Sequence, residues 1–185
     1  MSSVVAPLLV LGWGNPSRGD DALGPLLVER IDSLDQPPWP PGQVECLTDF
    51  QLQVEHALDL VGRQRVLFVD AAIGLPQPCT LRPLHPSRHA SLSTHALAPE
   101  AVLQVFTDLH GRAPPPCTML AIRATAFELG QPLSAQAQAD LELALACAIQ
   151  WLSDSATAVH AVVDGACTAH ETTVGTRPIP SKIAG

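Results

Sequence analysis

Short apolar runs alternate along this chain with segments of helical periodicity, and this alternation constrains the fold more than any other feature. The first run, residues 7–11, stops at the turn Gly12-Trp13-Gly14. Two later runs, at about residues 43–48 and 65–69, stop at Asp49 and Asp70. Alternating strands and helices predict an α/β fold with a mostly parallel sheet. We expect a single three-layer domain with a twisted sheet of about five strands flanked by helices.

The remaining elements follow from periodicity and from turn residues. Asp20 or Gly19 suits the N-cap of the first helix, and Gly111 stands where a helix would end. Residues 153–185 are rich in Ala, Thr, Ser and Gly, so we expect a partly ordered or flexible C-terminal extension after a domain of residues 1–152. Helices are expected at about 20–31, 53–61, 99–110 and 134–152, and further strands at about 79–84 and 118–123.

Composition excludes several classes of function. The chain has 18 acidic and 10 basic residues and a net charge of −8, with no basic stripe to bind nucleic acid or an anionic membrane. No apolar run is long enough to span a membrane, and the N-terminus lacks the basic region of a secretory signal. Five scattered cysteines indicate reduced thiols rather than a disulfide framework or a zinc site. These features favour a cytoplasmic protein.

Acidic residues follow three of the predicted strands. Asp20 and Asp21 come after the first strand and its glycine-rich turn, while Asp49 and Asp70 end the next two strands. Because the carboxyl ends of parallel strands share one edge, we expect these carboxylates to converge there. Like charges so placed raise each other's pKa unless a cation lies between them. One of the three histidines of the polar 85–97 segment (His85, His89 and His95) would add an imidazole ligand.

Simpler interpretations exist for each residue taken alone. An aspartate at a helix start is most often a cap, one at a strand end is often a turn former, and a loop histidine is usually solvated. A nucleotide-binding GxGxxG motif would need glycine at position 17, where this chain has Ser17. That departure argues against a nucleotide-dependent oxidoreductase. Cys167 and His170 are too few to suggest a metal site.

Several segments, taken in order, resemble one family. Residues 9–15 (Leu-Val-Leu-Gly-Trp-Gly-Asn) and 19–24 (Gly-Asp-Asp-Ala-Leu-Gly) resemble the opening of the [NiFe]-hydrogenase maturation proteases, the C-terminal endopeptidases that process the hydrogenase large subunit. Residues 68–72 resemble the family's VDA-type strand end, and residues 93–97 its S-x-H segment. Leu133-Ser134 before the last helix also fits, so the resemblance extends from residue 5 to about 152.

The resemblance implies both a site and a substrate. It places metal-contacting, catalytic residues at Asp21, Asp70 and His95. It implies an endopeptidase that removes the C-terminal extension of a [NiFe]-hydrogenase large-subunit precursor after nickel insertion. The nickel would be contacted in the precursor rather than held as a permanent cofactor. The alternative is a non-catalytic nickel-binding assembly factor for the same precursor. We expect a monomer.

One segment departs from many family members. Where they carry an Asp-Gly-Gly-Thr-like sequence, this chain has Asp49 followed by Phe50, Gln51, Leu52 and Gln53. The Gln-Leu-Gln form resembles that of proteases serving soluble, bidirectional NAD(P)-linked hydrogenases. Residues 50–53 are therefore candidate substrate-binding residues, although a plain strand-to-helix connection would look the same. Asp49 is the candidate for an assisting carboxylate. The sequence does not decide whether nickel takes part in the chemistry or only gates recognition.

Overall fold

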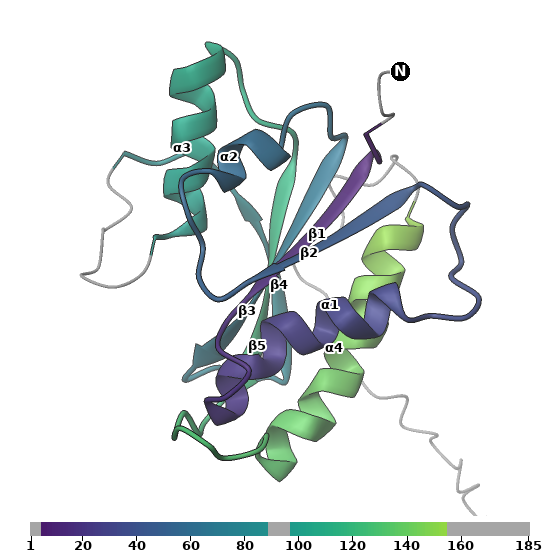
Figure 1. Ribbon diagram of the computed structural model, residues 1–185, viewed down its shortest axis with the longest axis vertical. Helices are drawn as coiled ribbons and strands as arrows, with labels where there is room; N and C mark the ends of the chain where they lie inside the picture. Colours follow the sequence, from purple (N-terminus) through teal and green to yellow (C-terminus); the bar gives the residue numbers. More distant parts are fainter. Residues whose placement is uncertain (1–4, 89–96, 155–185) are drawn as a thin grey trace, which may run out of the picture. The chain divides into compact units, whose positions relative to one another are not determined.

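Five strands form one sheet in the order β2-β1-β3-β5-β4 in the computed structural model, which describes residues 5–88 and 97–154 (Figure 1). Strands β1, β2, β3 and β5 are parallel, and β4 pairs with β5 in the antiparallel direction. The predicted mostly parallel sheet is confirmed. The strands are β1 (Leu8–Trp13), β2 (Val44–Asp49), β3 (Arg65–Ile73), β4 (Cys79–Leu84) and β5 (Cys117–Ala124).

Helices cover both faces of the sheet, which confirms the predicted three-layer α/β fold. Helices α1 (Leu23–Asp32) and α4 (Ala135–Ser153) lie on one face, while α2 (His56–Asp59) and α3 (Pro99–His110) lie on the other (Figure 1). Strand β1 is buried along its whole length, as expected of a central strand with both faces covered.

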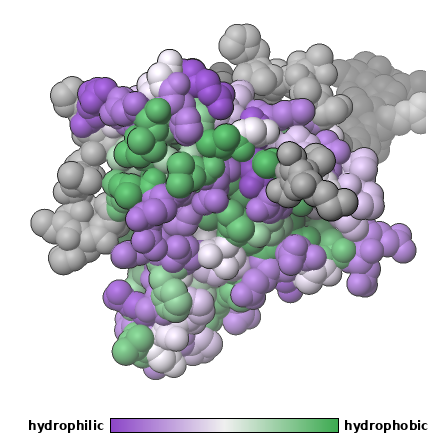
Figure 2. Space-filling model, turned by 45° about the horizontal axis from the view of Figure 1, so that its top comes forward, coloured by the Kyte–Doolittle hydropathy of each residue, from purple (hydrophilic) through white to green (hydrophobic). Residues whose placement is uncertain are grey.

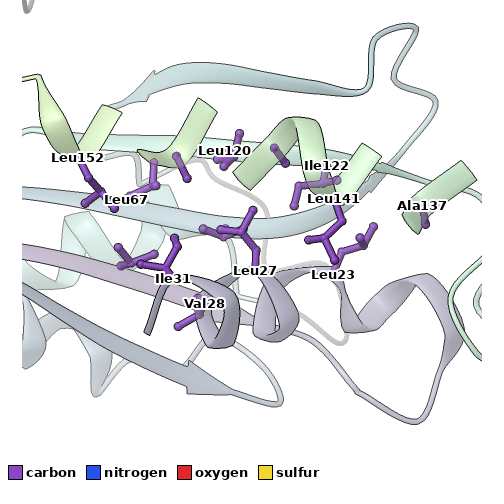
Figure 3. Close-up of a cluster of buried hydrophobic side chains, with 14 of the residues drawn as sticks. Leu23, Leu27, Val28, Ile31, Leu67, Leu120, Ile122, Ala137, Leu141 and Leu152 are labelled. Atoms are coloured by element: carbon purple, nitrogen blue, oxygen red, sulfur yellow. The ribbon is translucent and has the colours of Figure 1, made fainter. Parts of the chain in front are cut away.

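A core of aliphatic side chains fills the layer between the sheet and helices α1 and α4 (Figure 3). Leu27 of α1 and Leu67 of β3 are fully buried there, and burial of each such side chain contributes about 1.5–3 kcal/mol. The labelled members of this cluster are Leu23, Leu27, Val28, Ile31, Leu67, Leu120, Ile122, Ala137, Leu141 and Leu152. A second cluster, which includes Phe68 and Phe106, fills the opposite layer.

Helix α2 is much shorter than the helix predicted at 53–61. The amides of His56, Ala57 and Leu58 each donate to the carbonyl three residues earlier, which is the pattern of tight turns rather than of an α-helix. Leu52 and Leu60 at the two ends of this segment are both buried in the second cluster. Tertiary packing therefore sets the path of the chain here and overrides helical periodicity.

The predicted N-cap role of Asp20 is wrong. A 3₁₀ helix, Gly19–Ala22, precedes α1, and Arg18 and Ala22 occupy the two cap positions. The Asp20 side chain turns inward and accepts hydrogen bonds from a distant loop instead. Ser134 does cap α4, because its hydroxyl oxygen accepts from the Ala137 amide at 3.1 Å.

Among the described residues, none of the helices has both the length and the apolar character needed to cross a membrane. The predicted extension of residues 153–185 lies outside the described residues from residue 155 onward. That domain boundary stays a prediction.

Candidate active site at the carboxyl edge of the sheet

Three neighbouring strands place Asp49, Trp13 and Asp70 side by side. Trp13 and Asp49 end β1 and β2. The prediction that Asp70 ends its strand is wrong, because β3 stays paired with β5 as far as Ile73. In the register of β1 and β2, Trp13 lies opposite Asp49. In the register of β1 and β3, Gly12 lies opposite Val69, the residue before Asp70. The strand order β2-β1-β3 therefore puts the tryptophan between the two acids. This confirms that these strand ends share one edge.

Three glycines bring the start of α1 and the turn before it close to this edge. A Cβ on Gly24 would lie 2.3 Å from the Trp13 carbonyl oxygen, and one on Gly12 would lie 2.5 Å from the Gly24 carbonyl oxygen. Gly14 has a φ of +141°, and a Cβ there would lie 1.9 Å from the Asp21 carbonyl oxygen. Only glycine permits these approaches. As a result the backbone of Asp21 packs directly on the turn that ends β1.

Asp21 is half-buried and is oriented by that turn. The amide of Asn15 donates to Oδ2 of Asp21 at 3.0 Å, and the Asn15 side chain in turn accepts from the Ser17 amide at 2.9 Å. The remaining oxygen, Oδ1, has no hydrogen bond among those found within the described residues.

Asp70 is a half-buried carboxyl whose pKa is raised to about 7. Burial is the main cause, and the negative charge of Asp21 adds to it. The amide of Ala71, which donates to Oδ1 at 2.8 Å, and the indole N–H of Trp13 act in the opposite direction. Asp21 and Asp70 are thus close enough to interact electrostatically, as predicted for carboxylates gathered at this edge.

Trp13 is a site residue that the sequence reasoning missed. Its ring packs edge-to-face on Phe68, with 6.0 Å between centroids, and its side chain donates to Asp70. The packing fixes the indole, so the donor is held in place beside the carboxyl. The position of a tryptophan at the end of the first strand was the available signal.

Asp49 is held by its own loop. Its Oδ1 accepts from the Phe50 amide at 2.6 Å, and its Oδ2 accepts from the side-chain amide of Gln53 at 3.1 Å. His56 Nε2 lies 3.4 Å from Oδ2, while His56 Nδ1 accepts from the Gln53 amide at 2.9 Å. That second bond places the imidazole proton on Nε2, facing Asp49. The nearly buried His56 was also missed, since its role depends on the loop's fold.

Asp20 is fully buried and does not reach the edge. Its carboxylate accepts five hydrogen bonds, from the amides of Thr125, Ala126 and Ser134 and from the hydroxyls of Thr125 and Ser134. Burial alone would raise the pKa of Asp20, but these bonds more than offset it and hold that pKa below its ordinary value. Asp20 therefore ties the turn that carries Asp21 to the loop between β5 and α4.

His89 and His95 lie outside the described residues, and His85 is exposed just after β4. Within residues 5–88 and 97–154, no three histidine, cysteine or acidic side chains are grouped closely enough to hold a metal ion. The site as described therefore supplies two carboxylates, from Asp21 and Asp70. The predicted third ligand, His95, stays a prediction.

Large hydrophobic side chains are exposed in the segments that follow the strand ends. Phe50 follows β2, Ile73 ends β3, and Leu129 lies in the loop after β5; their exposed fractions are 68%, 77% and 75%. Leu52, by contrast, is 4% exposed and belongs to the core. Further along, exposed Val54, Leu58 and Val61 lie on the α2 side of the domain, where hydrophobic surface gathers (Figure 2).

Solved structures share this fold. Neither a protein-family model nor a curated protein sequence matches the chain. The [NiFe] hydrogenase maturation protease HycI from Thermococcus kodakarensis is 21% identical with a TM-score of 0.62, over 83% of this chain and 96% of that one. The hydrogenase maturating endopeptidase HybD from E. coli is 23% identical with a TM-score of 0.60, over 80% and 93%. An endopeptidase from Escherichia coli solved in solution is 25% identical with a TM-score of 0.61, also over 80% and 93%.

These structures match over nearly their whole lengths, and the matched part of this chain is large enough to hold the sheet and its helices. The chain therefore has the fold of the [NiFe] hydrogenase maturation proteases.

Proposed function

We propose that this chain is an endopeptidase that removes the C-terminal extension of a [NiFe]-hydrogenase large-subunit precursor. The fold it shares with the maturation proteases supports this proposal. So do the residues at the edge of the sheet, where Asp21 and Asp70 correspond to the motifs on which the family resemblance depends. We further propose that cleavage follows nickel insertion and that the precursor's nickel is the docking point.

The observation that carries the proposal is the pairing of Asp21 with Asp70. Two carboxyls in one partly buried site repel each other when both are ionised, and the pKa of Asp70 is raised to about 7 as a result of burial and of this charge. A cation delivered by the substrate would remove the repulsion and displace the proton. The site is therefore arranged to favour a substrate that carries positive charge at the point of contact.

The proposed division of roles uses three ligands from this chain. Asp21 and Asp70 would supply oxygen ligands and His95 a nitrogen ligand to nickel that is already bound by cysteine thiolates of the precursor. Docking through the metal would place the scissile peptide beside the site, so recognition is converted into proximity. The metal would then polarise the peptide carbonyl or acidify a bound water, or else it would serve only as a gate while a carboxylate activates the water.

Asp49 is the candidate for that assisting carboxylate. Its bonds to Phe50 and Gln53 and its closeness to His56 also suit a residue that shapes the loop. The two roles differ in their consequences. Asp49→Asn would abolish cleavage if Asp49 activates water, and would mainly raise KM if Asp49 shapes the loop.

The surface around the carboxylates suits a protein substrate. Phe50 on one side and Ile73 and Leu129 on the other expose apolar area in segments that follow β2, β3 and β5. Of the four candidate substrate-binding residues, Phe50, Gln51 and Gln53 are exposed, while Leu52 anchors the loop from below. We propose that Phe50 and the two glutamines contact the precursor. A soluble, bidirectional NAD(P)-linked hydrogenase is the proposed client, and the protease is proposed to act in the cytoplasm as a monomer.

The test is a cleavage assay with purified precursor, loaded with nickel or free of it, followed by intact mass. Loss of the C-terminal extension only from the nickel-loaded precursor is the expected result. Equal cleavage without nickel would overturn the nickel-dependent part. Complex formation without any change of mass would favour the non-catalytic assembly factor instead.

Variants of the three proposed ligands, with a matched control, test whether these residues are needed for cleavage. We expect Asp21→Asn, Asp70→Asn and His95→Ala each to lower kcat/KM at least about 100-fold. Asp35→Asn is the control, because Asp35 is exposed in the connection that leads into the opposite end of β2. Wild-type activity in all three site variants would contradict the assignment.

A further inference from the structure

Two cysteine thiols from distant parts of the chain lie in contact between β4 and α4. The Sγ atoms of Cys79 and Cys147 are 3.7 Å apart, although the residues are 68 positions apart in the sequence. Cys79 begins β4 and Cys147 lies in α4, and both are half-buried. The proposed peptide cleavage uses neither residue.

The surrounding contacts fix the positions of β4 and α4, the two elements that carry the thiols. Cys79 lies opposite Ile122 in the antiparallel pair, so its side chain shares the sheet face that α4 covers. Cys147 follows Asp140 by seven residues, or two helical turns, and so lies on the same side of α4. Both carboxylate oxygens of Asp140 accept from the Arg123 guanidinium, at 2.8 and 3.0 Å, and this ion pair fixes α4 against β5.

The backbone next to Cys79 is anchored by the same arginine. The Arg123 amide donates to the Pro78 carbonyl at 2.9 Å. Pro78, the residue before Cys79, is therefore hydrogen-bonded to β5. Strand β5 also carries Arg123, which forms the ion pair with Asp140 of α4. A disulfide needs sulfur atoms about 2.05 Å apart, so the two sulfur atoms must approach each other from their 3.7 Å contact for a bond to form.

Two other described cysteines, Cys46 and Cys117, are poor candidates for disulfide formation. Burial raises the pKa of the Cys117 thiol to about 12, and this thiol donates to the Pro115 carbonyl. Burial, followed by the charges of Asp32 and Glu45, raises the pKa of Cys46 to about 12. The thiolate is the reactive form of cysteine, so both groups are inert near neutral pH. They serve as internal controls.

We propose that Cys79 and Cys147 form a reversible disulfide by exchange with a low-molecular-weight disulfide of the glutathione class. One protein thiol loses its proton, and its thiolate attacks a sulfur of the reagent, which releases one reagent thiol. The second protein thiolate then attacks the protein sulfur of this mixed disulfide and releases the other reagent thiol. Two protein thiols are thereby oxidised by two electrons, and one reagent disulfide is reduced to two thiols.

The disulfide would link the edge strand β4 covalently to helix α4. Strand β4 lies at the edge of the sheet as described, next to β5, with which it pairs. A cross-link between β4 and α4 closes a long loop, which restricts the unfolded chain. The oxidised protein should therefore melt at least about 5 °C above the reduced protein.

The experiment uses the full chain with Cys167→Ser in every sample, so that this cysteine cannot exchange. The protein is equilibrated with an oxidising buffer of about 1 mM each of reduced and oxidised glutathione, quenched by alkylation and mapped by mass spectrometry. We expect more than half of the protein to carry a bridge between the peptides of Cys79 and Cys147. Dithiothreitol should restore both thiols and the lower melting temperature.

Control variants separate the proposed pair from other thiols. Cys79→Ser and Cys147→Ala should each abolish the bridge and leave a glutathione adduct on the remaining cysteine, whereas Cys46→Ser should not affect bridge formation. The proposal fails if glutathione adducts on Cys79 or Cys147 are the end product in the protein that retains both. It also fails if the bridge forms only in denaturant, or if it involves Cys46 or Cys117.

Discussion

Asp20 and Ser134 are joined by two hydrogen bonds across 114 positions of the chain, from the Ser134 amide at 2.8 Å and from its hydroxyl at 3.0 Å. Ser134 is also the N-cap of α4. One buried carboxylate therefore links the turn that carries Asp21 to the start of the longest helix. This linkage, rather than direct contact with substrate, is what the structure assigns to the first aspartate of the Asp20-Asp21 pair.

We expect Asp20→Asn to lower the free energy of unfolding by about 3 kcal/mol, because the charge is lost and an NH₂ group replaces one of the two buried oxygens that together accept five hydrogen bonds. Urea unfolding at pH 7 measures this loss. Asp21→Asn is the matched comparison and should cost less than about 1 kcal/mol, since Asp21 is half-buried and, among the described residues, accepts one backbone hydrogen bond. The same loss in both variants would contradict the assignment.

The two acids should also differ in their response to pH. The hydrogen bonds hold the folded-state pKa of Asp20 below the unfolded value of 3.8. Its contribution to stability is therefore complete above about pH 4 and is lost as the pH falls through the folded-state pKa. The difference between wild type and Asp20→Asn should shrink only below about pH 4.

Close packing of α1 on β1 makes Gly24 intolerant of substitution. A Cβ at this position would lie 2.3 Å from the Trp13 carbonyl oxygen and 2.9 Å from that of Val69, and backbone atoms cannot move aside cheaply. Alanine normally stabilises a helix relative to glycine, but here Gly24→Ala should cost more than about 3 kcal/mol. Thermal or urea unfolding measures the loss.

Gly42 supplies the matched control for this prediction. Its φ is +76° and nothing lies within 4 Å of the position that a Cβ would occupy, so Gly42→Ala carries backbone strain without a clash. We expect a cost of about 1–2 kcal/mol. If the Gly24→Ala protein were as stable as the Gly42→Ala protein, α1 would be able to move away from β1 at little cost in free energy.

The fold was predictable from sequence because its signals are local. Apolar runs that end at turns specify β1 and β3, and the apolar periodicity of residues 99–110 together with Gly111 specifies α3. The edge shared by Asp49 and Asp70 then follows from the rule that parallel strands end on one side. The length of helix α2 was predicted wrongly, because the burial of Leu52 and Leu60 sets the path of the chain there and overrides the helical periodicity between them.

The site was only partly predictable, because side-chain partners depend on tertiary contacts. The placement of Asp70 beside Asp21 follows from topology, but the donation from Trp13 requires the ring to pack on Phe68. In the same way, Asp20 was predicted to be a helix cap from its position before the helix. Its five hydrogen-bond donors come from residues 125–134, more than a hundred positions away, and the sequence does not reveal them. Sequence spacing carries no information about such partners.

Phe50 and Leu52 should separate substrate binding from stability. Phe50 is 68% exposed, so Phe50→Ser should change the free energy of unfolding by less than about 0.5 kcal/mol. If Phe50 contacts the precursor, the same change should lower kcat/KM about tenfold through KM. Leu52 is 4% exposed, so Leu52→Ala should cost about 2–5 kcal/mol through loss of packing.

Leu109→Ser is the control for the surface effect. Leu109 is 62% exposed on α3, away from the carboxyl edge, and its loss should leave both stability and cleavage unchanged. Equal effects of Phe50→Ser and Leu109→Ser on KM would argue against a specific contact at Phe50.

The carboxyl of Asp70 should make the stability of the fold depend on pH. Its pKa is about 7 in the folded protein and near 3.8 in the unfolded chain, so the folded state binds more protons between these values. Stability from this group therefore falls as the pH rises from about 4 to 7. Asp70→Asn, which cannot ionise, should raise the melting temperature relative to wild type at pH 8 and leave it unchanged at pH 4. A melting-temperature difference that is the same at both pH values would show that the pKa of Asp70 is not raised in the folded protein.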